Sequence, residues 1–493
     1  MSPMLNQAIS RARIFELTSE EWALLFAAAL LTVAGIAAVS PDVTTWSAFG
    51  LGFTALVAGH LCMTARRFVA FPDLIVAAAC LQWIVAPWLA VEYPSRMVVY
   101  HMTLPIDEYL RYAVPATIAL WVGLHLPASR IMSTTWALPE TEQLSKPLRR
   151  TLDMAIVIGV ITDVYSDYVP PQLAFFGYLV ASLRFVGALG WMITKTPGWM
   201  IRVLGVMLHF VATQSAGGGM FYLVVHWGGY FLLVYGFMKR WRMAMAMALI
   251  VGIIGLGLLQ TVKPAFRDSL IEERPSGPVE AFTRLTSMLW ERVRQGSAID
   301  PDADTGDTLV RFNQGWIIAR IMTHVPAEEP YAMGETLTDA AIFTVLPRFL
   351  FPNKREGAST QLFLRFTGIK LPPNTRMGLG VIGELYANFG MVGGVFATLL
   401  YGGMMGLILL FFADRAQKNP LWWAVAPAIL LPCVEPGFNI EDVSNHIVKG
   451  SVVFAIIWKL CPPVQRLLAP PAHTPADEEF EDMSSFDDVV TDP

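Results

Sequence analysis

A carboxylate and an amide stand one helical turn apart in the segment RMGLGVIGELYANFGMVGG, residues 376–394. On a helix, residues four positions apart lie on the same face, so Glu384 and Asn388 form a polar stripe within an apolar segment. A carboxylate at the boundary of an apolar bundle is costly unless it is paired or used. Glu384 is therefore a candidate for binding or acid–base chemistry, and the alternative is an ion pair with a nearby arginine.

The segment before this stripe, residues 263–379, is rich in arginine. A guanidinium group is planar and can donate two parallel hydrogen bonds to phosphate oxygens, so the segment favours an anionic ligand such as the phosphate of a lipid headgroup. Ordinary contact with anionic lipids and internal ion pairs are the alternatives. Arg311 and Arg320 lie about half a turn apart on a continuous helix and cannot both hold one ligand.

One further arginine, Arg184, lies near the middle of an apolar run, residues 172–193. Small residues share its helical face, and such faces pack against other helices, so we expect Arg184 to point into a bundle. A charged side chain in that position is a functional candidate by default. The alternative is a structural ion pair with Asp163 or Asp167 on the preceding run.

Small residues also follow one face of the segment that carries Glu384. They are Gly383, Ala387, Gly390 and Gly394. This spacing indicates close packing of the helix against a neighbour. A phosphate-binding loop is less favoured, because no strand precedes these glycines.

The composition determines the class of protein that must position these residues. The chain has 493 residues, of which 54% are hydrophobic and 15% are charged, and its mean hydropathy is +0.49. A soluble domain carries roughly 25% charged residues. The composition therefore indicates a polytopic membrane protein and excludes a soluble enzyme, a nucleic-acid-binding protein and a disulfide scaffold. The four cysteines lack metal-ligand spacing, and no nucleotide or nucleophile motif is present, so we expect no metal and no cofactor.

Apolar runs predict an all-α fold with about twelve transmembrane helices. The predicted spans are 22–39, 46–64, 73–91, 109–126, 152–167, 172–193, 199–213, 219–237, 243–262, 388–412, 421–435 and 446–461. The fifth, seventh and eleventh runs are short and polar for spans, so ten or eleven crossings are the alternatives.

Lysine and arginine are concentrated in alternate short connections between these runs. The positive-inside rule therefore places both termini in the cytoplasm, and parity places the 263–379 loop on the outer face. Its basic residues do not conflict with this, because long loops translocate largely regardless of charge. Helical patterns at 278–297, 307–325 and 335–350 indicate that the loop is a folded region.

Four regions result from this division. They are an N-terminal transmembrane bundle of about nine spans at 1–262, the large loop at 263–379, about three C-terminal transmembrane helices at 380–466, and a tail at 467–493. Acidic residues crowd the tail, which predicts a disordered cytoplasmic segment.

Four motifs follow one another in the loop and after it. They are RFNQGWIIARIM at 311–322, PYAMGET at 330–336, VLPRFLFPNK at 345–354 and GLGVIGELYANFG at 378–390. In this order they resemble the oligosaccharide repeat-unit polymerases, the Wzy-like O-antigen and exopolysaccharide polymerases of bacterial inner membranes. The rest of the chain resembles that family in span count and in the placement of the long loop.

The resemblance implies a GT-C-like glycosyltransferase that uses undecaprenyl-diphosphate-linked oligosaccharides at the periplasmic face. A growing chain would be transferred to the nonreducing sugar of a new lipid-linked repeat, and the lipid diphosphate would leave. Basic groups would neutralise the departing diphosphate, and a carboxylate would take the proton of the attacking hydroxyl. The candidate bases are Glu384 and, second, Glu335, and the candidate binding residues are Arg184, Arg311, Arg348, Lys354 and Arg376.

Three other functions remain open. A ligase would move a finished glycan from lipid diphosphate to a lipid-A core, and the sequence separates it poorly from a polymerase. A transporter or flippase is less favoured, because no inverted repeat is evident. A noncatalytic partner of an assembly system could use the acidic tail to recruit a cytoplasmic protein. The expected partners are the lipid-linked oligosaccharide, membrane lipids, and a flippase and chain-length regulator of the same pathway, without nucleic acid.

Overall fold

The computed structural model describes most of the chain, and all regular structure in the described segments is helical. The described residues are 19–40, 43–64, 70–127, 144–170, 173–216, 222–239, 259, 262–263, 265–273, 275–294, 310, 312–345, 358–372, 375, 377–430, 433, 435 and 437–469.

The helices fall into a bundle and a group within the long loop. The bundle helices are α2 (Ser19–Val39), α3 (Thr45–Thr64), α4 (Phe71–Cys80), α5 (Ala86–Glu92), α6 (Ile106–His125), α7 (Lys146–Val164), α8 (Ala174–Ala181), α9 (Leu183–Ile193), α10 (Trp199–Ala216), α11 (Tyr222–Lys239), α18 (Val381–Lys418), α19 (Trp422–Leu430), α20 (Ile440–Leu460) and α21 (Pro462–Leu468). The loop helices are α13 (Pro278–Arg294), α15 (Gly315–His324), α16 (Glu335–Val345) and α17 (Ala358–Thr367).

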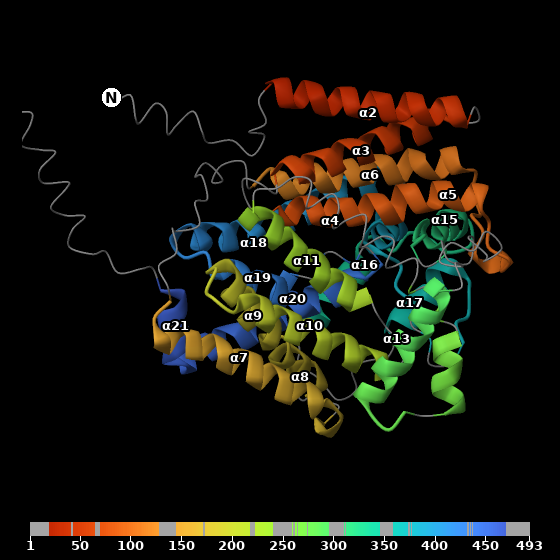
Figure 1. Ribbon diagram of the computed structural model, residues 1–493. Coiled ribbons are helices and arrows are strands. Elements are labelled where there is room, and N and C mark those ends of the chain that lie inside the picture. Colours follow the sequence, from red (N-terminus) through yellow and green to blue (C-terminus); the bar gives the residue numbers. More distant parts are fainter. Residues whose placement is uncertain are drawn as a thin grey trace, which may run out of the picture.

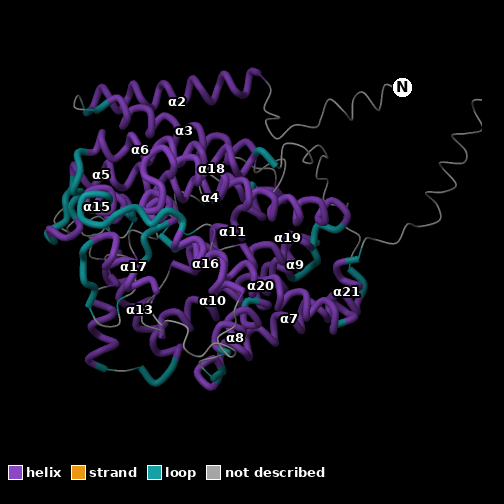
Figure 2. The backbone as a smooth tube through the Cα atoms, turned by 180° about the vertical axis from the view of Figure 1, so that it is seen from behind, coloured by secondary structure: helices purple, strands orange, loops and turns teal. Residues whose placement is uncertain are grey.

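The bundle helices lie in layers, with α2 along one edge, α3 and α6 beneath it, and α7 and α8 along the opposite edge (Figure 1). Three loop helices, α13, α15 and α17, gather at one end of the bundle, and α21 lies at the other end (Figures 1 and 2). The two ends of the bundle are therefore unlike: one is covered by the folded loop, and the other holds the last described helix.

The most extensive contact in the bundle joins α6 and α18, which run in the same direction. Near the start of both helices, the hydroxyl of Tyr112 donates to the carbonyl of Ile382 at 2.6 Å. Further along both, a Cβ on Gly402 or Gly406 would lie 2.8 or 2.7 Å from a carbonyl oxygen of α6. Glycine is required there because the two backbones approach too closely for a side chain.

Each predicted apolar run overlaps one of the helices named above, except 243–262, of which only residues 259 and 262 are described. Among the described residues, five helical segments are long and apolar enough to cross a membrane, and α20 with α21 makes a sixth across a bend of 105°. The five are Ser19–Ala38, Thr45–Thr64, Phe71–Glu92, Ala174–Ile193 and Val381–Lys418. The all-helical membrane-type architecture is confirmed, and the number of twelve crossings stays a prediction.

Two boundaries differ from the sequence analysis. In the described part of the pattern at 307–325, the helix begins at Gly315, because the side chain of Asn313 accepts the N–H of Trp316 at 3.2 Å and holds residues 312–314 in a turn before the helix. The predicted tail begins too early, since Leu467 and Leu468 are buried in α21. Helix α17 lies in a stretch for which no helix was predicted.

Candidate functional site

Glu384 lies in the first turn of α18 and is only 1% exposed. Gly380 precedes the helix with a φ of 72°, a conformation that glycine adopts without strain. The chain thereby turns into α18 so that the first carboxylate of the helix is inside the protein. A carboxylate at this depth requires partners that satisfy its oxygens.

Two donors from other helices hold the carboxylate of Glu384. The Thr336 hydroxyl of α16 donates to Oε1 at 2.9 Å, and the backbone N–H of Ile440 donates to Oε2 at 2.8 Å. Ile440 begins α20, whose first N–H groups lack partners within the helix and carry partial positive charge. Asn439, the preceding residue, accepts the N–H of Leu379 at 2.7 Å instead of capping α20. Glu384 therefore caps α20 from a neighbouring helix and joins α16, α18 and α20.

Asn388, one turn further along α18, completes this group. Its amide nitrogen donates to the hydroxyl oxygen of Thr336 and to the carbonyl of Glu384, both at 2.8 Å. Its side-chain oxygen accepts the N–H of Gly334 at 2.9 Å. The predicted polar stripe is therefore confirmed, since both of its side chains bond to the same threonine. We call Glu384, Asn388 and Thr336 the Glu384 cluster.

The glycine stripe beside the cluster is not the continuous helical surface that the spacing predicts. Gly390 has a φ of 69° and breaks α18. The carbonyls of Ala387 and Asn388 accept the N–H groups of Ala332 and Met333 at 3.0 and 3.1 Å. The break thus fastens the loop segment before α16 to α18. The first and last glycines of the stripe pack closely against α15 and α6, as predicted.

Glu335, the second candidate base, is held by a cation. Both of its carboxylate oxygens accept hydrogen bonds from Arg365, at 2.9 and 3.1 Å, and the same guanidinium donates to Glu329 at 2.6 Å. Hydrogen bonds to Glu335 and Glu329 raise the pKa of Arg365, so its guanidinium stays charged. A proton acceptor in such a two-point pair must first leave its partner, which makes Glu335 the weaker candidate.

Arg184 is buried and paired. Its Nη1 atom lies 2.8 Å from Oδ1 of Asp163 and 3.4 Å from the carbonyl oxygen of Gly159. The Nε2 atom of His209 lies 3.1 Å from the other oxygen of Asp163. The structure thus contains the ion pair that the sequence offered as the alternative to ligand binding. A direct role for Arg184 in binding stays a prediction.

The four remaining candidate binding residues lie outside the described residues. They are Arg311, Arg348, Lys354 and Arg376. Their role in binding an anion also stays a prediction.

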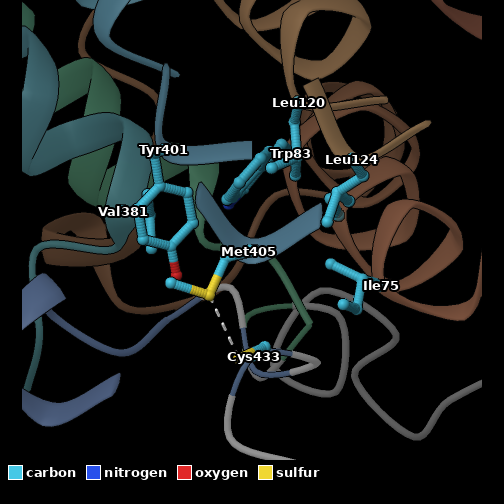
Figure 3. Close-up of a pocket in the computed structure, with 9 residues that line it drawn as sticks. Ile75, Trp83, Leu120, Leu124, Val381, Tyr401, Met405 and Cys433 are labelled. Carbon is cyan, nitrogen blue, oxygen red and sulfur yellow. Dashed lines mark hydrogen bonds between the residues drawn. The ribbon is translucent and has the colours of Figure 1, made fainter. Parts of the chain in front are cut away.

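A small apolar cavity of about 10 Å³ lies among α4, α6 and α18 (Figure 3). Trp83, Leu120, Val381 and Met405 are among the residues that line it, with the Tyr401 ring along one side. A volume of this size accommodates one water molecule at most. The cavity is therefore a packing defect within the bundle and has no room for a sugar or a lipid.

Two partners of Glu384 were missed by the sequence analysis. Thr336 and Ile440 lie 48 and 56 residues away along the chain, so helical spacing gives no signal for either. One signal for the start of α20 was present: Asn439 followed by Glu441 and Asp442 is typical of a helix N-terminus.

The chemistry open to the Glu384 cluster is that of a carboxylate which accepts hydrogen bonds from neutral donors. A substrate hydroxyl that takes the place of the Thr336 hydroxyl would lie within hydrogen-bond distance of Oε1, and Glu384 could then accept its proton. Comparison of the chain with protein families, with curated proteins and with solved structures found no match.

Proposed function

We propose that this protein is a bacterial inner-membrane glycosyltransferase that polymerises undecaprenyl-diphosphate-linked oligosaccharide repeat units at the periplasmic face. The observation that carries the proposal is the Glu384 cluster. A buried carboxylate, satisfied by a hydroxyl and a backbone N–H, joins a helix of the long loop to the starts of two bundle helices. The motif that contains it, GLGVIGELYANFG, is part of the resemblance to the repeat-unit polymerases.

The arrangement of the bundle supports the proposed sidedness. Helices α6 and α18 run in the same direction, which agrees with an outer-to-inner path for both spans in the twelve-span topology. Helices α13, α15 and α17 gather at one end, and α21 lies at the other (Figure 1). A periplasmic loop and a cytoplasmic C-terminal region require this separation.

In the proposed reaction, a hydroxyl of the nonreducing sugar attacks the anomeric carbon of the growing chain. The new glycosidic bond forms as the bond to the lipid diphosphate breaks, and the proton of the hydroxyl passes to Glu384. Arg311, Arg348, Lys354 and Arg376 neutralise the charge that develops on the diphosphate, which is electrostatic stabilisation of the transition state. Entry of the substrate requires the Thr336 hydroxyl to move away from Glu384.

Replacing Glu384 by glutamine tests the proposal. The Glu384→Gln amide can still accept the N–H of Ile440, but it cannot take a proton, so we expect turnover to fall by roughly 10²–10⁴ while substrate still binds. Turnover should be measured on purified protein with lipid-linked repeat units, together with thermal stability.

A neighbouring carboxylate provides the matched control. Glu441 lies in the first turn of α20, next to Ile440, and accepts a hydrogen bond only from Asn445 at 3.3 Å among the bonds described. Glu441→Gln should retain turnover. If Glu384→Gln polymerises as well as this control while folded, Glu384 is not the base, and its role is the structural one of capping α20.

A further inference from the structure

A second cluster of titratable side chains lies at the other end of the α6–α18 pair. It consists of His60 near the end of α3, Asp73 in the first turn of α4 and His125 at the end of α6, with side-chain exposures of 0%, 0% and 2%. We call it the His–Asp–His cluster. Oδ1 of Asp73 lies 2.9 Å from Nδ1 of His60 and 3.2 Å from Nε2 of His125. One carboxylate oxygen therefore faces two imidazole nitrogens.

The other ring nitrogen of His125 determines where its proton lies. Nδ1 is 2.7 Å from the carbonyl oxygen of Trp121, which can only accept, so Nδ1 carries a hydrogen. In the neutral ring, Nε2 then directs a lone pair toward the carboxylate of Asp73, and this atom has no hydrogen-bond partner. A histidine that binds a metal through one nitrogen donates its other N–H to a carbonyl or carboxylate in the same way.

The carboxylate of Asp73 is oriented by one more contact. The hydroxyl oxygen of Thr64 lies 2.9 Å from Oδ2 and 2.7 Å from the carbonyl oxygen of His60, and its contact with Oδ2 leaves Oδ1 directed at the two histidines. All three candidate ligand atoms lie within 4.8 Å of one another. Ligands placed tetrahedrally at about 2.0–2.1 Å from zinc are about 3.3 Å apart. The two measured separations from Oδ1 are within a few tenths of an ångström of that value. To bind a cation, Oδ1 must move slightly outward, and the two histidine nitrogens, which lie within 4.8 Å of each other, must both direct their lone pairs at the ion.

We propose that His60, Asp73 and His125 bind a divalent transition-metal ion, with zinc the best match to two imidazoles and one carboxylate. Three protein ligands leave the fourth position to a water molecule. The ion would tie together the ends of α3, α4 and α6, opposite the Glu384 cluster, and would neutralise a carboxylate buried in the bundle. Sequence analysis missed the site because its ligands lie on three helices, 13 or more residues apart.

The competing arrangement is a triad held by protons alone, in which imidazolium rings pair with Asp73. It differs from the metal site in one measurable respect, since it needs no ion and is indifferent to a chelator. The test uses full-length protein purified in detergent through a tag without histidines. Bound zinc is quantified after dialysis, the unfolding temperature is measured with chelator and after zinc is restored, and Co²⁺ is added to the chelated protein.

We expect about one zinc per chain, a lower unfolding temperature with chelator, recovery with zinc, and a visible Co²⁺ spectrum with nitrogen and oxygen ligands. Thr64→Val removes the hydroxyl that orients Asp73 and should weaken zinc binding by about 10- to 100-fold. Asp73→Asn keeps the side-chain shape, removes a charged ligand and should weaken binding further.

The matched control is a buried histidine that has no carboxylate in contact among the residues that the structure describes. His446 lies in α20 with its Nε2 atom 3.0 Å from the carbonyl oxygen of Ala428, and His446→Asn should bind zinc as the wild type does. Wild-type protein that holds no zinc, gives no Co²⁺ spectrum and is unaffected by chelator would overturn the proposal in favour of the proton-held triad. Equal zinc binding by folded Asp73→Asn and wild type would also overturn it, because the ion would then lie elsewhere.

Discussion

At Glu384, the described partners are a hydroxyl and a backbone N–H, where the sequence offered an arginine as the partner in an ion pair. This difference matters for chemistry, because a carboxylate paired with a guanidinium has less tendency to accept a proton. Helical spacing predicted that Glu384 and Asn388 share a face. It could not predict Thr336, since that contact depends on how α16 folds back onto α18.

Among single residues, the proposed reaction depends most on the positively charged side chains that neutralise the departing diphosphate. Arg348→Ala and Arg376→Ala should each reduce polymer synthesis by about 10²- to 10³-fold, because one donor to the developing charge is lost. The corresponding lysine variants should recover only part of the activity, since lysine keeps the charge and loses the two-point fork. Initial rates with lipid-linked repeat units, on protein whose folding is checked by thermal unfolding, give the comparison.

Near-wild-type rates for both alanine variants would remove these two arginines from the proposed site. The candidates for diphosphate binding would then be Arg184 and Arg311. Because Arg184 already pairs with Asp163, its loss would first be expected to destabilise the bundle by leaving His209 as the remaining described partner of that half-buried carboxylate.

At the scale of elements, the close contact between α6 and α18 predicts how substitutions of two neighbouring glycines change the stability of the protein. A methyl group on Gly402 would lie 2.8 Å from the carbonyl oxygen of Leu120, whereas one on Gly403 would meet nothing within 4 Å. Gly402→Ala should therefore destabilise the protein by about 1–3 kcal/mol through overpacking. Gly403→Ala is the matched control and should leave the unfolding temperature unchanged or slightly raised.

The unfolding temperatures of the two purified variants, measured in the same detergent, test this prediction. Equal unfolding temperatures would show that the helices separate enough to accept the methyl group, and the parallel packing of α6 and α18 would lose its main support.

The elements themselves were the most predictable part of the fold. Long apolar runs located the bundle helices, because a helix in an apolar setting satisfies its own backbone groups. Their interruptions were less predictable. The break at Gly390 accompanies hydrogen bonds donated by loop N–H groups, which the local sequence pattern does not reveal. Before α15, the side chain of Asn313 accepts the N–H of Trp316 and holds a turn that helical periodicity does not predict.

For the molecule as a whole, the distribution of basic residues and the packing of the bundle both predict which side of the membrane each loop faces. A single cysteine at Ser359, in the long loop, should react with an impermeant thiol reagent in intact spheroplasts. A single cysteine at Ser145, just before α7, should react only after the membrane is disrupted. The background protein must lack the four native cysteines, all of which are free thiols. The reverse labelling pattern would refute the topology and, with it, a periplasmic site.

The His–Asp–His cluster illustrates what sequence patterns leave out at this scale. Its residues come from three helices, and their contact depends on the assembled bundle. Apolar periodicity places each helix, but it does not specify which polar side chains meet when those helices pack.

The most direct test of the proposed function is the product made by the purified wild-type protein from undecaprenyl-diphosphate-linked repeat units as the sole substrate. Polymerisation predicts a ladder of lipid-linked chains that differ by one repeat, with release of undecaprenyl diphosphate for each bond formed. Glycan transferred to an added lipid-A core, without a ladder, would identify a ligase and contradict the proposal. Active reconstituted protein that moves the lipid across vesicles and forms no glycosidic bond would contradict it as well.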